Sequence, residues 1–216
     1  MKKIILMGAV ALTTLSTQAQ DFKVPLEKTF LAFDTTQDQG VKLEQSNKLS
    51  LIAKKWGDPW VTHYYAAYSK TVLSYMEKDA GKRDAYLDEA DKELGDAVSI
   101  LKKDNDETYV LAAMIANARM AVDPAQRWPK YSALFKSNLE SAQGINPDNP
   151  RMFYLKGTST YFTPKAFGGG KKNAMPYFEK ADGLFAKETG GDITKPYWGK
   201  RQNAYFLTQC KQEDKE

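Results

Sequence analysis

The sequence predicts an all-α protein built from consecutive helix hairpins, and three observations support this fold class. A ring residue followed four positions later by a small residue recurs three times, in His63–Ala67, Tyr109–Ala113 and Phe153–Gly157. Each copy is followed by a second ladder of apolar and small residues at helical spacing. No stretch shows the apolar–polar alternation of a strand. Because a pattern that recurs over tens of residues indicates a repeat architecture, it defines the fold before any local motif is considered.

Caps, prolines and glycines mark where each helix begins and ends. Asp58-Pro59 and Asn149-Pro150 each place a capping side chain before a proline at the first helical position. Asp106-Glu107 places acids at the positive end of a helix dipole. Glycine-containing breaks separate most of the segments. In chain order, we expect a short helical turn at 25–33 and helices at 37–56, 59–78, 83–103, 107–121, 128–143, 150–162, 172–187 and 196–212.

Small residues indicate how these helices pair. A large side chain would hold two crossing helices apart, so a small residue at a fixed place in each helix predicts close packing there. These positions are Ala67, Ala113 and Gly157 on the first helices, and Ala97, Ala142 and Ala181 on the second helices. The resulting repeats lie near 59–103, 107–143 and 150–187, with capping helices near 37–56 and 196–212. Together they predict one domain over 20–216.

The second helix of the third unit carries a family resemblance. Ala174-x3-Phe178-x2-Ala181, with Ala142 followed by Pro147, resembles the second helix of a tetratricopeptide repeat. Phe135 stands where that family prefers alanine, and the spacing exceeds the usual ~34 residues, so the chain resembles a divergent exported member of unassigned function. The resemblance implies a right-handed α-solenoid of about three TPR-like helix hairpins with N- and C-terminal capping helices and a concave groove.

The resemblance also implies which side chains line that groove. Tyrosines there would offer apolar area together with a polar group, and an arginine could bind a carboxylate. We expect a non-catalytic scaffold that binds a protein segment in the periplasm or cell envelope. The alternative is a small-molecule or oligosaccharide-binding periplasmic protein. The groove positions would be Tyr64, Tyr68, Asn117, Arg151, Tyr154, Thr158 and Tyr161.

The first residues predict export. Lys2 and Lys3 precede an apolar run of signal-peptide length, and Ala19 ends a small-residue cleavage site, so we expect a signal peptide over 1–19. No cysteine follows the run, which disfavours a lipoprotein, and no later stretch is long and apolar enough for a membrane span. The protein is expected to be periplasmic or secreted. The lone Cys210 excludes an internal disulfide and is expected to be a small buried hydrophobic side chain.

The glycine-rich stretch 164–172 is the most unusual local sequence. Gly168, Gly169, Gly170 and Lys171 precede a predicted helix, where backbone N–H groups could hold an anion. The stretch lacks the Ser or Thr of a nucleotide-binding P-loop. A plain turn between unequal helices is the favoured interpretation.

No catalytic, metal or cofactor site is predicted. His63, the only histidine, occupies the column of Tyr109 and Phe153, so it is expected to fill a ring-shaped slot, and one His with one Cys cannot build a zinc site of the usual His/Cys composition. The carboxylates near Asp88 and Glu93 are expected to form a solvated helix face. Charges are interspersed without a basic stripe, which disfavours nucleic-acid binding. The sequence names neither the partner nor the oligomeric state.

Overall fold

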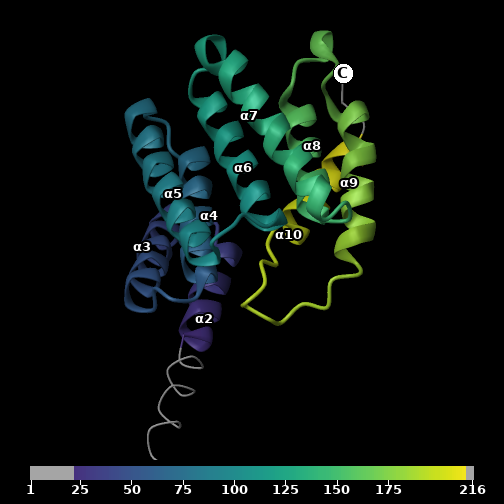
Figure 1. The fold of residues 1–216 in the computed structure, drawn as a ribbon. Coiled ribbons are helices and arrows are strands. Elements are labelled where there is room, and N and C mark those ends of the chain that lie inside the picture. The colour runs from purple at the N-terminus through teal and green to yellow at the C-terminus, as the bar shows by residue number, and fades with distance from the viewer. Residues whose placement is uncertain (1–21, 213–216) are drawn as a thin grey trace, which may run out of the picture.

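The computed structural model describes residues 22–212, and all regular structure in that range is helical (Figure 1). The fold class predicted from the sequence is therefore confirmed at the level of an all-α protein. The helices are α2 (Lys23–Thr35), α3 (Gln39–Lys55), α4 (Trp60–Met76), α5 (Ala80–Leu101), α6 (Asp106–Val122), α7 (Pro124–Ile145), α8 (Pro150–Phe162), the short 3-10 helix η1 (Lys165–Phe167), α9 (Lys171–Phe185) and α10 (Lys200–Lys211).

Consecutive helices pair into hairpins, and each hairpin contributes one helix to each of two rows. In the first row α2, α4, α6 and α8 contact one another in turn, while α3, α5, α7 and α9 each pack on the helix before it. Figure 1 shows the hairpins side by side, from α2/α3 to α8/α9. This arrangement has the pairing that the repeats predict. Its superhelical sense and its membership of the tetratricopeptide class stay predictions.

The small residues lie where the helices cross, as the sequence predicts. Ala67 and Ala113 on the first row, and Ala97, Ala142 and Ala181 on the second, are fully buried. Gly157 is the tightest position, because a Cβ atom there would lie 2.6 Å from the ring of Phe178 on α9. The line of contact between the two rows of helices, which we call the packing seam, therefore depends on small side chains at the crossing points.

Most predicted helix boundaries are close to the observed ones, with four corrections. The helix predicted over 196–212 begins only at Lys200, and the short turn predicted at 25–33 is the full helix α2, which forms a hairpin with α3. The Asn149 side chain accepts a hydrogen bond from the Arg151 backbone N–H, and Asn105 forms a capping box with Thr108. Asp58 does not cap α4, which begins at Trp60 after Pro59 without a side-chain cap. The helix predicted over 128–143 spans 124–145, since proline in the first turn of a helix is tolerated.

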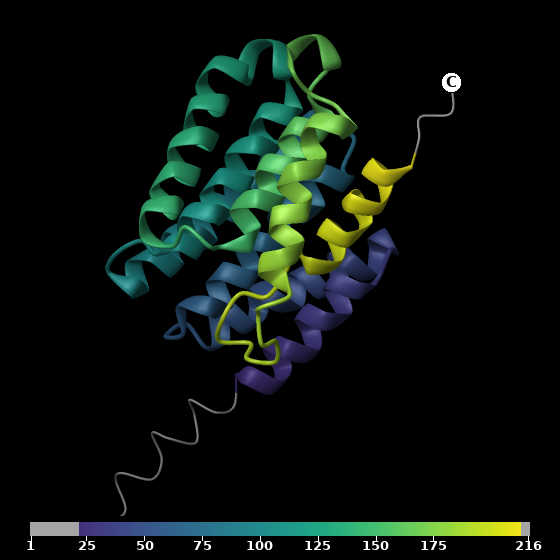
Figure 2. The same cartoon turned by 90° about the vertical axis from the view of Figure 1, so that its right-hand side faces the viewer.

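The C-terminal segment, residues 186–211, returns to the first row and is not simply an outer cap. Helix α10 packs on α9, and Figure 2 shows it (yellow) running beside α2 (purple). The Gln202 side chain donates a 2.7 Å hydrogen bond to Asp34, and the Arg201 side chain donates to the Asp34 carbonyl at 3.0 Å. Two ends of the described chain are thereby joined.

Within residues 22–212, no helix has both the length and the apolar character needed to cross a membrane. The predicted signal peptide, 1–19, lies outside the described residues.

Candidate functional site

The predicted groove residues lie on α4, α6 and α8, but most of them are interior. Tyr64, Tyr68, Arg151 and Tyr154 are buried, whereas Asn117, Thr158 and Tyr161 are half-buried. The expectation of an open groove at the four buried positions is corrected, because Trp198 of the C-terminal segment fills the space in front of them. Its ring stacks on Tyr68 at 4.8 Å and meets the Tyr154 ring edge-on at 6.2 Å.

Arg151 is the centre of a buried polar network that holds this segment. Its guanidinium contacts Glu107 at 3.2 Å and Glu188 at 2.7 Å, and donates to the Pro196 carbonyl at 2.5 Å. The Trp198 indole N–H donates to the Tyr64 hydroxyl at 2.8 Å, and that hydroxyl donates to Glu107 at 3.0 Å. A charged arginine inside an apolar core needs such partners. Arg151, predicted to bind a ligand carboxylate, therefore binds two carboxylates of its own chain.

Burial shifts the pKa values of the acidic groups in this network. Burial raises the pKa of the Glu107 carboxyl, and the positive charge of Arg151 opposes that rise. Burial also raises the pKa of the Tyr64 hydroxyl well above its usual range, with a further rise from Glu107. The Tyr64 hydroxyl is consequently a neutral hydrogen-bonding group in the interior.

The glycine-rich stretch folds back tightly on the end of α8. The Gly170 N–H donates to the Thr160 carbonyl at 2.9 Å and the Gly169 N–H to the Pro164 carbonyl at 3.2 Å. A Cβ atom on Gly169 would lie 1.9 Å from the Thr163 carbonyl oxygen, so no other residue fits there. The glycines thus build a specific loop, which agrees with the favoured interpretation as a turn.

This loop forms one wall of a cleft of about 470 Å³, which we call the C-terminal cleft. Its chemistry is mixed, since it combines lysine side chains and a helix N-terminus with the thioether of Met175 and the thiol of Cys210. Cys210 is half-buried, and burial raises the pKa of its thiol while the charge of Lys171 opposes the rise. The lining residues are Lys165, Gly169, Gly170, Lys171, Lys172, Asn173, Met175, Cys210 and Gln212.

Aromatic residues lie on the elements that carry the C-terminal cleft, or next to them, although none of them is among its lining residues. Phe206 lies one turn before Cys210 on α10 and meets the ring of Phe162 edge-on at 5.8 Å. Phe162 at the end of α8 is 71% exposed, and Phe167 in the loop is 81% exposed. Large exposed aromatic side chains gathered beside a cleft are unusual unless something covers them. The cleft thus combines cations with sulfur atoms, and α8, η1 and α10 carry aromatic side chains near it in the sequence.

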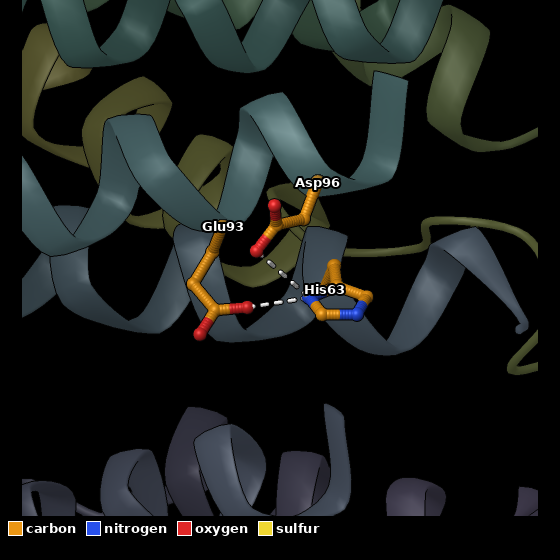
Figure 3. A group of neighbouring side chains, drawn as sticks. All are labelled: His63, Glu93 and Asp96. Carbon is orange, nitrogen blue, oxygen red and sulfur yellow. Dashed lines mark hydrogen bonds and ion pairs between the residues drawn. The ribbon is translucent and has the colours of Figure 1, made fainter. Parts of the chain in front are cut away.

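The predicted acidic face on α5 is not simply solvated, because several of its carboxylates tie α5 to its neighbours. Asp88 and Asp91 bind the guanidinium of Arg119 on α6, each at 2.6 Å. Glu93 accepts a 2.6 Å hydrogen bond from Nδ1 of His63 on α4, as Figure 3 shows. His63 therefore does more than fill a ring-shaped slot.

Comparison with solved structures gives a relative over the whole chain. The HusA haemophore from Porphyromonas gingivalis is 30% identical to this chain and superposes with a TM-score of 0.73, covering 97% of this chain and 100% of its own. The chain belongs to the same family as HusA. No protein-family model matches the chain, nor does any curated protein. The comparisons therefore support a relationship to HusA, while the resemblance to tetratricopeptide repeats stays a prediction.

Proposed function

We propose that this protein is an exported, non-catalytic binding protein for haem or a closely related tetrapyrrole. The observation that carries the proposal is the full-length relationship to HusA, a haemophore, at 30% identity. This choice corresponds to the small-molecule alternative predicted from the sequence. The protein-interaction scaffold has less support, because four of its seven predicted groove side chains lie in the interior.

The C-terminal cleft is the place whose chemistry suits such a ligand best. Haem is a flat apolar macrocycle with carboxylates along one edge, so a site for it needs apolar area together with cations. Phe162, Phe167 and Phe206 supply aromatic surface beside the cleft. Lys171 and Lys172 lie on its wall at the N-terminus of α9, where a helix dipole also favours negative charge. The carboxylates would lie against these lysines and the macrocycle against the rings.

Titration of haemin into the purified protein, followed by the Soret band, tests the function. We expect saturable binding that weakens about tenfold or more in the double variant Lys171→Glu, Lys172→Glu, since a charge-assisted hydrogen bond contributes ~1.5–3 kcal/mol. The matched control is Lys102→Glu, Lys103→Glu, an adjacent exposed pair outside the cleft lining, which should leave affinity unchanged.

Two outcomes separate the function from its location. Absence of haemin binding by the unmodified protein would overturn the proposed function. Binding that is unaffected by reversal of the cleft lysines would leave the function standing and reject the C-terminal cleft. Haem dimethyl ester, which has no free carboxylate, should bind the charge-reversed and unmodified proteins equally well if the lysines act as described.

A further inference from the structure

His63 lies where α4 crosses α5, beside two carboxylates of α5. Its Nδ1 atom is 2.6 Å from Glu93 Oε2 and 4.0 Å from Asp96 Oδ2. Glu93 and Asp96 are three residues apart on one helix, so both side chains project from the same face. Figure 3 shows the two carboxylates directed toward the imidazole ring from α5.

These three groups have the donor set and the spacing of a metal site. An imidazole nitrogen and two carboxylate oxygens are ligands that Zn²⁺ accepts, and here one such atom from each residue lies within 4.8 Å of the others. In a tetrahedral zinc site with bonds of about 2.0–2.2 Å, neighbouring ligand atoms are about 3.3 Å apart. That spacing falls between the 2.6 Å and 4.0 Å separations seen here. Rotating Asp96 toward the imidazole and Glu93 slightly away from it would bring both separations to this value.

The burial and the charge of these three side chains also suit a metal site. The side chains of His63 and Glu93 are mostly buried where α4 crosses α5, while that of Asp96 is more exposed. Lys92 now pairs with Asp96 at 2.7 Å, but its side chain is largely exposed and can be displaced into solvent. A divalent cation would offset the negative charge of both carboxylates.

We propose that His63, Glu93 and Asp96 bind a divalent transition-metal ion such as Zn²⁺, with water completing the coordination. The ion would join α4 to α5 and stabilise their crossing, since a ligand that binds only the native state raises its stability. The site shares no residue and no helix with the C-terminal cleft, whose lining lies on η1, α9 and α10 and the segments next to them. It therefore stands independently of the haem proposal.

Isothermal titration of ZnCl₂ into the porphyrin-free protein tests the site, with Cys210→Ser as the background so that the thiol cannot bind the metal. We expect one ion per chain, loss of binding in His63→Gln, and affinity reduced at least tenfold in Asp96→Asn. Asp96→Asn is the decisive variant, because the His63–Glu93 hydrogen bond does not use Asp96. The control Asp91→Asn removes a carboxylate of the same helix outside the cluster and should bind zinc normally.

Two results would overturn the proposal: no zinc binding by the Cys210→Ser protein, or equal affinity in the Asp96→Asn and Asp91→Asn proteins. A second measurement protects against misfolded variants. Zinc should raise the urea midpoint of the unmodified protein, followed by far-UV circular dichroism, and it should not do so for Asp96→Asn. An unchanged midpoint at saturating zinc in the unmodified protein would contradict the proposed ligation of the native state.

Discussion

Replacing Trp198 by alanine should destabilise the protein by about 3–5 kcal/mol, the usual cost of truncating a buried aromatic side chain. The indole is 2% exposed. It stacks 4.8 Å from the ring of Tyr68, and its N–H donates to Tyr64. Its removal empties the space between the C-terminal segment and the first row of helices. Because single domains have a free energy of unfolding of about 5–15 kcal/mol, the variant should be marginally stable.

Urea denaturation followed by far-UV circular dichroism measures the loss. For an m value of about 1–3 kcal/mol/M, a loss of 3–5 kcal/mol lowers the urea midpoint by about 1 M or more. The matched control is Trp128→Ala, since Trp128 is 61% exposed and its truncation should change stability by less than about 0.5 kcal/mol. If both alanine variants had the same midpoint, Trp198 would not be holding the C-terminal segment, and the description of the interior would be wrong.

Two further predictions concern the helix crossing and an ion pair. Gly157→Ala should destabilise the protein by up to about 2 kcal/mol, because overpacking against Phe178 (about 1–3 kcal/mol) exceeds the gain in helix propensity (about 1 kcal/mol). Gly183→Ala, where a Cβ atom meets nothing within 4 Å, should be stabilising, and thermal melts of both variants check the opposite signs. Asp84 accepts two 2.7 Å hydrogen bonds from Arg127, which lower the pKa of its carboxyl. Asp84→Asn should therefore lower the free energy of unfolding by about 0.2–1 kcal/mol at neutral pH. The loss should disappear as the pH falls below 3.8 and through the lowered pKa of folded Asp84. Urea midpoints measured across this pH range check it, and a difference between the two proteins that does not change with pH would contradict it.

The hairpins and their seam could be predicted because their signals are local. A ring and a small residue four positions apart, such as Phe153 and Gly157, describe one face of one helix. The same face at regular intervals then predicts the crossings, as Gly157 confirms, because a Cβ atom there would lie only 2.6 Å from the Phe178 ring. Caps such as Asn149 are equally local and were predictable for the same reason.

The contents of the groove could not be predicted, because they depend on contacts between distant residues. Trp198 and Tyr64 are separated by 134 positions, and no periodic pattern records that the C-terminal segment returns to the first row. One signal was present: Arg151 lies among apolar residues at the start of α8, and a buried arginine requires acidic partners. Glu93 was assigned to a solvated face because its partner, His63, lies 30 positions earlier.

The joining of α10 to α2 affects how the chain can fold. Each hairpin is a local structure that forms quickly, but the hydrogen bonds from Gln202 to Asp34 and from Trp198 to Tyr64 span 168 and 134 positions. Such contacts raise the contact order, which slows folding. In an open array of repeats, folding can nucleate at any repeat and propagate to the adjacent ones. Here the contacts of the C-terminal segment can form only after that segment is available, so we expect the docking of α10 on α2 to be a late step of folding.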